Sequence, residues 1–409
     1  MNILVSIAGL AFLILIHEAG HFFVARAVRM RPRKFYVFFP PVLVRKVHNG
    51  IEYGLGAIPL GGYVKIPGMH RPAGRDLESH FSAALDDAPS LRARLAAAQI
   101  TLDEPALDNE RAGTALSELR SATAESHLSE NGRARAEKGL TDVEDGISGE
   151  AYWRAPVWKR IAVIAAGPAT NLLFAVGMLA IVFALGVPSE ANRTVDVVAE
   201  DTPADAMGLT PGDQVVAVDG MPVTSFDEVS VGIRSSEGEP ITLTVVRDGE
   251  KVVLGPRSAE LVDDRYRLGF IPGITYESYG PGAAVIEAFK ETGTVTVAIG
   301  DSLSQIVTSD GREDIATPLG IVQGSSKVLD QGFREFLAIL ALISLSLALL
   351  NMLPLLPLDG GHILFALIER FRGRAVPRAT YERASALGIA LVLILFVIGL
   401  TNDIGRLGG

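Results

Sequence analysis

The first long apolar stretch of the protein, "LAFLILIHEAGHFFVARAV" from Leu10 to Val28, places three titratable side chains in the middle of a membrane-span pattern. They are His17, Glu18 and His21. Titratable groups are expensive in hydrocarbon and are functional by default where they occur there. The stretch therefore predicts a membrane-spanning helix that carries a functional site.

The letters HEAGH fit the pattern His-Glu-x-x-His. Positions i and i+4 share one face of a helix, so His17 and His21 can direct two imidazoles at one metal ion. Glu18 lies beside them, where it can accept a proton from water. Catalytic zinc sites generally have three protein ligands, so a third ligand is expected from another part of the sequence.

The best source of that ligand is "NMLPLLPLDGGHIL", which begins at Asn351. The protein has no cysteine, so the ligand is a histidine or an oxygen donor. Asp359 is the only carboxylate in this apolar stretch, and its alternative role is the N-cap of a helix beginning at Gly360. His362 is a rival ligand that ranks below it. The other histidines are expected in cytoplasmic loops, as solvated side chains: His48, His70, His80 and His127.

Hydropathy and length predict four membrane spans, because a span needs roughly 20 apolar residues. The predicted spans are 1–28, 157–187, 336–362 and 384–400. The protein of 409 residues is 48% hydrophobic and 21% charged, so we expect a polytopic α-helical membrane protein with sizeable water-facing parts. Its net charge of −10 gives no indication of nucleic-acid binding.

Basic residues orient these spans. They gather after the first span, around the second, and between the third and fourth. By the positive-inside rule, 29–156 and 369–383 are cytoplasmic, and both termini and the loop 188–335 lie outside. No basic segment precedes the first apolar run, so we expect a span and not a secretory signal.

Two cytoplasmic regions follow the first span. Within 29–70, alternating apolar residues from Gly50 to Met69 predict a membrane-associated β-hairpin around Gly61 and Gly62. The hairpin is either a small sheet packed on the membrane face or an edge that pairs with an extended peptide. Region 71–150 is rich in Ala, Glu, Arg and Ser, and predicts one or two exposed helices in a partly disordered insert.

Outside the membrane, 193–270 predicts a compact β-rich domain, with several short apolar runs separated by Gly, Pro and Asp. Its segment "PADAMGLTPGDQVVAVDGMPV" resembles a bacterial PDZ domain, which binds an extended peptide or the C-terminus of a protein. A domain that only guards the site sterically is the alternative. Residues 281–333 predict an amphipathic segment on the outer membrane surface.

The second span contains "GPATN", from Gly167 to Asn171. A Gly-Pro pair at this depth is expected to interrupt the helix, which a membrane tolerates only against protein or water. Asn171 either makes a hydrogen bond within the helical bundle or meets the substrate.

The motifs "HEAGH", "GPATN" and "NMLPLLPLDGG", in this order in separate spans, resemble the site-2 protease family of intramembrane zinc metalloproteases. The segments "IPLGGYVKIPGM" and "PLGIVQ" resemble its bacterial members that regulate envelope-stress sigma factors. The resemblance covers all four spans and the PDZ-like domain, but finds no counterpart for 71–150. It implies a Zn²⁺ ion bound by His17, His21 and Asp359, with Glu18 as the catalytic acid and base.

The resemblance also implies Asn171 and Asn351 as polar groups near the scissile segment. It implies the hairpin, with Gly61, Gly62 and Tyr63, as the edge that clamps an unwound substrate. Only one PDZ-like domain is readable, where some bacterial relatives have two in tandem, so the way in which substrates are filtered by size stays open.

These expectations lead to peptide hydrolysis inside the bilayer. The expected substrate is a single-pass membrane protein, either an anti-sigma factor already trimmed outside or a leftover signal peptide, cut in the inner half of its helix. Two other interpretations remain: a membrane-anchored PDZ scaffold with a structural metal, and a metal transporter with His, Glu and Asp on its pathway.

Overall fold

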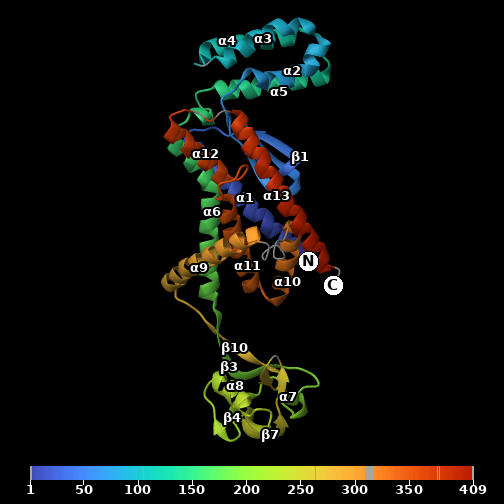
Figure 1. Ribbon diagram of the computed structural model, residues 1–409, viewed down its shortest axis with the longest axis vertical. Helices are drawn as coiled ribbons and strands as arrows, with labels where there is room; N and C mark the ends of the chain where they lie inside the picture. Colours follow the sequence, from blue (N-terminus) through green and yellow to red (C-terminus); the bar gives the residue numbers. More distant parts are fainter. Residues whose placement is uncertain are drawn as a thin grey trace. The chain divides into compact units, whose positions relative to one another are not determined.

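The computed structural model describes residues 2–104, 106–262, 264–308, 317–374, 376 and 378–407. The protein divides into two compact units, 180–287 and the remainder. Among the described residues, four helices are long and apolar enough to cross a membrane: α1 (Asn2–Ala27), α6 (Val157–Leu185), α11 (Phe333–Asn351) and α13 (Arg378–Leu407) (Figure 1). The predicted polytopic helical architecture is confirmed.

The predicted third span is divided into two helices. After α11 ends at Asn351, a turn that includes Pro354 and Pro357 leads into α12 (Asp359–Arg372). Leu358 is the N-cap of α12, and it makes no capping hydrogen bond through its side-chain atoms. The predicted N-cap role of Asp359 is therefore wrong, because Asp359 is already the first helical residue.

The GPATN segment lies within an unbroken helix. Helix α6 continues through Pro168, so the predicted interruption is wrong. Proline removes a single N–H, and membrane helices tolerate this where neighbouring helices and hydroxyl side chains satisfy the backbone. Two residues further on, the Thr170 hydroxyl donates to the Ala166 carbonyl of the same helix at 2.7 Å.

The predicted surface segment contains helices α9 (Pro281–Thr308) and α10 (Pro318–Gln331), and its residues 309–316 lie outside the described ones. Helix α10 packs against α1 and α11. The Asp403 carboxylate of α13 anchors its start, accepting hydrogen bonds from the backbone N–H groups of Thr317 (2.9 Å) and Gly320 (3.2 Å). This part of the segment therefore belongs to the helical assembly and not to a surface layer.

The predicted hairpin region contains β1 (Lys34–His48) and β2 (Ile51–Lys65). Its turn lies at Asn49 and Gly50, with φ of 50° and 74°, and not at Gly61 and Gly62 as predicted. A two-residue hairpin turn of type I′ requires positive φ at both positions, and Asn-Gly is its preferred sequence.

Two separate parts of β2 pair with the beginning of β1, one on each side of it. Phe35 of β1 pairs with Tyr53 early in β2 and with Val64 near its end. Residues 62–65 therefore return to the beginning of β1 and form an outer edge of this small sheet.

The insert is an ordered four-helix bundle, so the prediction of one or two exposed helices is wrong. It contains α2 (Gly74–Asp87), α3 (Arg92–Asp103), α4 (Asn109–Glu125) and α5 (Glu130–Ile147) (Figure 1). Each helix contributes Leu, Ala or Phe at helical spacing to a shared core that includes Phe81, Leu116 and Leu140. Its surface composition is that of a soluble domain, which disguises this core.

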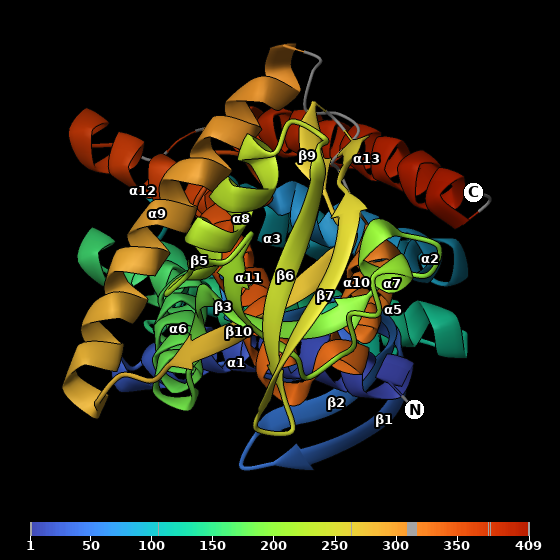
Figure 2. The same cartoon turned by 90° about the horizontal axis from the view of Figure 1, so that it is seen from below.

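The unit 180–287 is built on a sheet with the strand order β10-β3-β4-β6-β7. The strands are β3 (Val187–Val198), β4 (Gln214–Val218), β6 (Pro240–Arg247), β7 (Glu250–Ser258) and β10 (Phe270–Glu277), with a short β5 (Met221–Pro222) beside β4. Helices α7 (Pro203–Ala206) and α8 (Phe226–Ser235) complete it, with a ribbon of β8 (Glu260–Val262) and β9 (Arg265–Arg267). Figure 2 shows β6 and β7 side by side.

This unit has its own apolar core, which includes Val215, Leu243 and Val245. The β-rich fold predicted for 193–270 is present. Strand β10 was missed, because it lies almost entirely beyond the predicted boundary and pairs with β3 from the far end of the domain.

Truncating the core of the insert will loosen it. Leu116 is fully buried, so Leu116→Ala is expected to cost about 3 kcal/mol of the bundle's unfolding free energy. Native-state hydrogen exchange of α2–α5 in the full-length protein measures this. Ile100, whose side chain is 69% exposed in α3, is the matched control, and Ile100→Ala should change stability by less than about 0.5 kcal/mol. Equal effects of the two variants would contradict a packed bundle.

Candidate metal centre

The histidines of α1 and the first carboxylate of α12 meet at one point. His17 Nε2 and His21 Nε2 are 3.2 Å apart. Oδ2 of Asp359 lies 3.3 Å from His17 Nε2 and 3.4 Å from His21 Nε2. Residues that are more than three hundred positions apart in the sequence thus form a triangle of three potential ligand atoms.

This triangle has the size that a tetrahedral zinc site needs. Zinc–ligand bonds of 2.0–2.1 Å at tetrahedral angles separate the ligand atoms by about 3.3 Å. Asp359 Oδ2 is buried, and no hydrogen-bond donor among the described residues satisfies it. Among the residues that the structure describes, this is the one cluster of three or more His, Asp or Glu side chains suited to a metal ion. The donor set therefore fits Zn²⁺.

Neighbouring groups orient both imidazoles. His21 Nδ1 lies 2.8 Å from the Val163 carbonyl of α6. A carbonyl only accepts, so His21 carries its hydrogen on Nδ1 and keeps the Nε2 lone pair for the metal. The Val163 contact escaped sequence analysis because a backbone carbonyl has no sequence signature.

Asn171 plays the same part for His17. Its side chain is fully buried, and its amide group lies 3.5 Å from His17 Nδ1. With the amide nitrogen facing His17, the amide oxygen has no hydrogen-bond partner among the described residues. Rotating the amide by 180° places the oxygen opposite His17 Nδ1 instead. In that orientation Oδ1 accepts the Nδ1 hydrogen and leaves His17 Nε2 for the metal. The Ser344 hydroxyl of α11 donates to the backbone carbonyl of Asn171 at 2.9 Å and so helps to fix its position.

Two glycines allow the helices to approach this closely. A Cβ on Gly167 would lie 2.3 Å from His21 Nε2, and a Cβ on Gly20 would lie 2.5 Å from the Ala166 carbonyl. Gly167 is the first residue of GPATN, so the motif supplies space for the imidazoles as well as Asn171.

Glu18 is buried beside the triangle and is covered by β2. A Cβ on Gly62 would lie 2.2 Å from Glu18 Cγ, so backbone alone fits here. Gly61 lies against the Phe39 ring, and the rings of Tyr63 and Tyr36 are in edge contact at 6.2 Å. The predicted hairpin glycines thus lie at or next to the catalytic candidate, although the turn itself is elsewhere.

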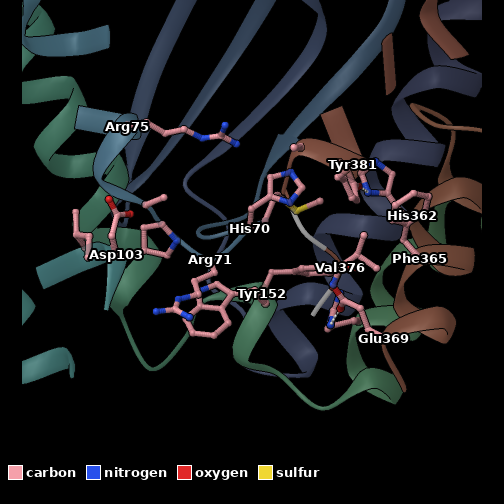
Figure 3. Close-up of a pocket in the computed structure, with 17 residues that line it drawn as sticks. His70, Arg71, Arg75, Asp103, Tyr152, His362, Phe365, Glu369, Val376 and Tyr381 are labelled. Carbon is pink, nitrogen blue, oxygen red and sulfur yellow. Dashed lines mark hydrogen bonds and ion pairs between the residues drawn. The ribbon is translucent and has the colours of Figure 1, made fainter. Parts of the chain in front are cut away.

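Neither Asn351 nor His362 belongs to the triangle. Asn351, at the end of α11, donates to its own helix at the Leu347 carbonyl, 2.9 Å away. His362 faces a separate cavity of about 540 Å³, where its Nδ1 is hydrogen-bonded to the Tyr381 hydroxyl (Figure 3). His70, predicted to be solvated, lines the same cavity and contacts the Tyr381 ring.

The geometry defines a class: a metallopeptidase whose histidine pair and carboxylate are carried by helices of a membrane protein. The model of peptidase family M50 matches residues 5–395. A protein of Agrobacterium fabrum named "Putative zinc metalloprotease" is 31% identical over 98% of this protein and 94% of its own length. A Brucella suis protein with the same description is 30% identical, over 97% and 93%. The "Regulator of sigma-E protease RseP" of Salmonella typhimurium is 26% identical over 99% of both proteins.

The chain therefore belongs to peptidase family M50, the site-2 proteases. It is a zinc-dependent metalloendopeptidase of the intramembrane type, which decides against the scaffold and transporter interpretations.

Filling the space at Gly167 should disrupt the metal centre. The added methyl group of Gly167→Ala pushes against His21 Nε2, so we expect zinc affinity to fall at least about tenfold. Competition with a chromogenic chelator measures this. Gly177 of the same helix, with no described atom within 4 Å of its Cβ position, is the control, and Gly177→Ala should bind zinc as the parent does. Unchanged affinity of Gly167→Ala would contradict the site.

Proposed function

We propose that the protein cuts a single-pass membrane protein within the inner half of its transmembrane helix, with Glu18 as acid and base and with His17, His21 and Asp359 as the zinc ligands. The observation that carries this proposal is the 3.2–3.4 Å triangle of ligand atoms beside a buried glutamate. Asn171 is proposed to orient His17.

A zinc ion held by His17, His21 and Asp359 would supply a Lewis acid for the scissile carbonyl and for activation of water near neutral pH. Glu18 accepts the proton of the attacking water and delivers it to the leaving amide nitrogen. Its burial under β2 keeps bulk water from competing for that proton.

A helical substrate hides its carbonyl groups in i to i−4 hydrogen bonds, so it must unwind before it can be cut. In the described sheet, residues 62–65 pair on one side only, with the beginning of β1. The other side can pair with an extended substrate segment and replace the backbone bonds lost on unwinding. Gly61, Gly62 and Tyr63 form this edge next to Glu18, and Asn351 is proposed as a further polar group near the scissile segment.

The candidate spans and the sigma-E regulators among the relatives support a location in the bacterial inner membrane. The positive-inside rule supports an orientation with both termini and the unit 180–287 outside and with 29–156 and 369–383 in the cytoplasm. The histidine pair then lies in the cytoplasmic half of α1, and cleavage releases a cytoplasmic product. The relatives named as regulators of sigma-E support an anti-sigma factor as the substrate. A remnant signal peptide is the second candidate.

The β-rich unit is proposed to be a PDZ domain. Its strands, its helix α7 within the segment "PADAMGL" and its independent core support this assignment. It would bind the new C-terminus of a substrate trimmed outside the membrane, or exclude substrates that have not been trimmed.

Proteolysis by the purified protein tests the mechanism. A tagged single-pass helix in detergent should be cut by the parent protein and not in the presence of a zinc chelator. Glu18→Gln is expected to lower kcat by at least about a hundredfold, because the amide cannot accept the proton. Mass spectrometry of the new termini should place the cut in the cytoplasmic half of the helix.

Glu78→Gln, at an exposed position of α2, is the matched control and should leave kcat unchanged. Cleavage by Glu18→Gln at the rate of the parent protein would refute the assignment of the acid and base.

A further inference from the structure

Strand β2 connects the metal centre to the helical insert within four residues. Gly62 lies against Glu18, and Lys65 forms an ion pair with Asp142 of α5. The backbone N–H of Arg33 donates to the backbone carbonyl of Lys65 at 2.7 Å, which connects the beginning of β1 to the end of β2. A shift of α5 would therefore be transmitted directly to the strand that covers the catalytic glutamate.

A second ion pair strengthens this attachment. Arg33 donates to Asp145 Oδ1 from Nε at 3.0 Å and from Nη2 at 2.7 Å. The Asp145 side chain is only 13% exposed, whereas the Arg33 side chain is 37% exposed, so the pair is partly shielded from solvent. The nearby carboxylate raises the pKa of the Arg33 guanidinium, chiefly through this hydrogen bond.

The position of the two aspartates indicates that they serve this contact. The C-terminal end of a helix carries partial negative charge, which disfavours carboxylates there. Helix α5 nevertheless places Asp142 and Asp145 near its C-terminal end and has no basic residue in its last turn. The cations that offset this cost come from the β-sheet, as Lys65 and Arg33.

The segment after β2 is held in the same way. The Trp153 indole N–H donates to the Gly146 carbonyl of α5 at 2.8 Å, and the Trp153 backbone N–H donates to the Gly68 carbonyl at 3.0 Å. Two kinds of contact thus join the end of α5 to the end of β2 and the segment after it. One is the side-chain ion pairs, and the other is Trp153, which is hydrogen-bonded to both segments.

We infer that the four-helix insert is a brace that sets the position of the 61–65 edge over Glu18, with Arg33, Lys65, Asp142 and Asp145 as positioning residues. The inference rests on the proposed function, and it assigns a regulatory role to the insert: whatever displaces α5 from the sheet lowers proteolysis. The zinc ligands come from α1 and α12, so the metal itself is held independently of the brace.

Charge exchange across the Arg33–Asp145 pair tests the inference. Arg33→Asp and Asp145→Arg should each lower kcat about tenfold, and the double exchange should restore it to within about twofold. Zinc affinity should be the same in all of them. Asp145→Asn keeps the shape of the side chain and should lower kcat by a smaller factor. It controls for the possibility that the charge reversals lower kcat by disturbing folding.

Arg94→Glu is the control, because Arg94 and Glu118 form an ion pair (3.0 Å) on the exposed surface of the same bundle. This variant should retain the parent kcat.

Hydrogen exchange of residues 58–66 gives a readout that does not require activity. It should speed up in the single reversals and return to the parent rate in the double exchange. If the parent protein cuts no substrate but exchange behaves in this way, the brace stands and the proposed function fails. Unchanged exchange in the single reversals, or faster exchange with unchanged proteolysis, would overturn the inference.

Discussion

The structure depends on bringing two imidazoles and a carboxylate to within 3.4 Å of one another in the apolar part of a membrane protein. Without a cation this arrangement is unfavourable, because a buried carboxylate needs compensating charge and hydrogen bonds. A zinc ion held by this triangle would supply that charge, and its binding would then be coupled to assembly of the helices. The helices α1, α6, α11 and α12 each contribute either a candidate ligand or a group that helps to orient one.

The same constraint explains where side chains are missing. The imidazoles can meet Asp359 only if α6 passes close to α1, and a methyl group at Gly20 or Gly167 would prevent this. On the other side of the site, Gly62 lets the backbone of β2 rest on Glu18. Glycines on α1, α6 and β2 thus provide the space around the metal centre, whereas its titratable side chains come from α1 and α12.

Much of this arrangement could be predicted from sequence, because the signals are local. A run of apolar residues identifies a membrane helix, and the spacing of His17 and His21 identifies one face of it. Asp359 was accessible because carboxylates are so rare in such stretches. Asn171 was recognised as a polar group of the site, but its partner, His17, became visible only when α6 was placed beside α1.

Other features depend on contacts that sequence patterns do not record. The hairpin turn was misplaced because the apolar residues on either side of Gly61-Gly62 were interpreted as the two strands, whereas Asn49-Gly50 has the preferred turn sequence and the required backbone geometry. The insert was underestimated because its composition is polar, although Leu and Ala recur at helical spacing and form a core. Pro354 and Pro357 indicate the break before α12, but the close packing around Gly360, whose Cβ position lies 2.2 Å from the Met352 carbonyl, has no sequence signal.

If the outer edge of β2 binds the substrate as proposed, this has a consequence for selectivity. A strand edge recognises the peptide backbone, which is the same in every substrate, so side-chain pockets contribute little to the choice of the cut site. Selection then falls on how readily a helix opens: residues with low helix propensity, such as glycine and β-branched residues, lower the cost of exposing a carbonyl. Transmembrane helices that do not unwind, including the enzyme's own, would then be spared.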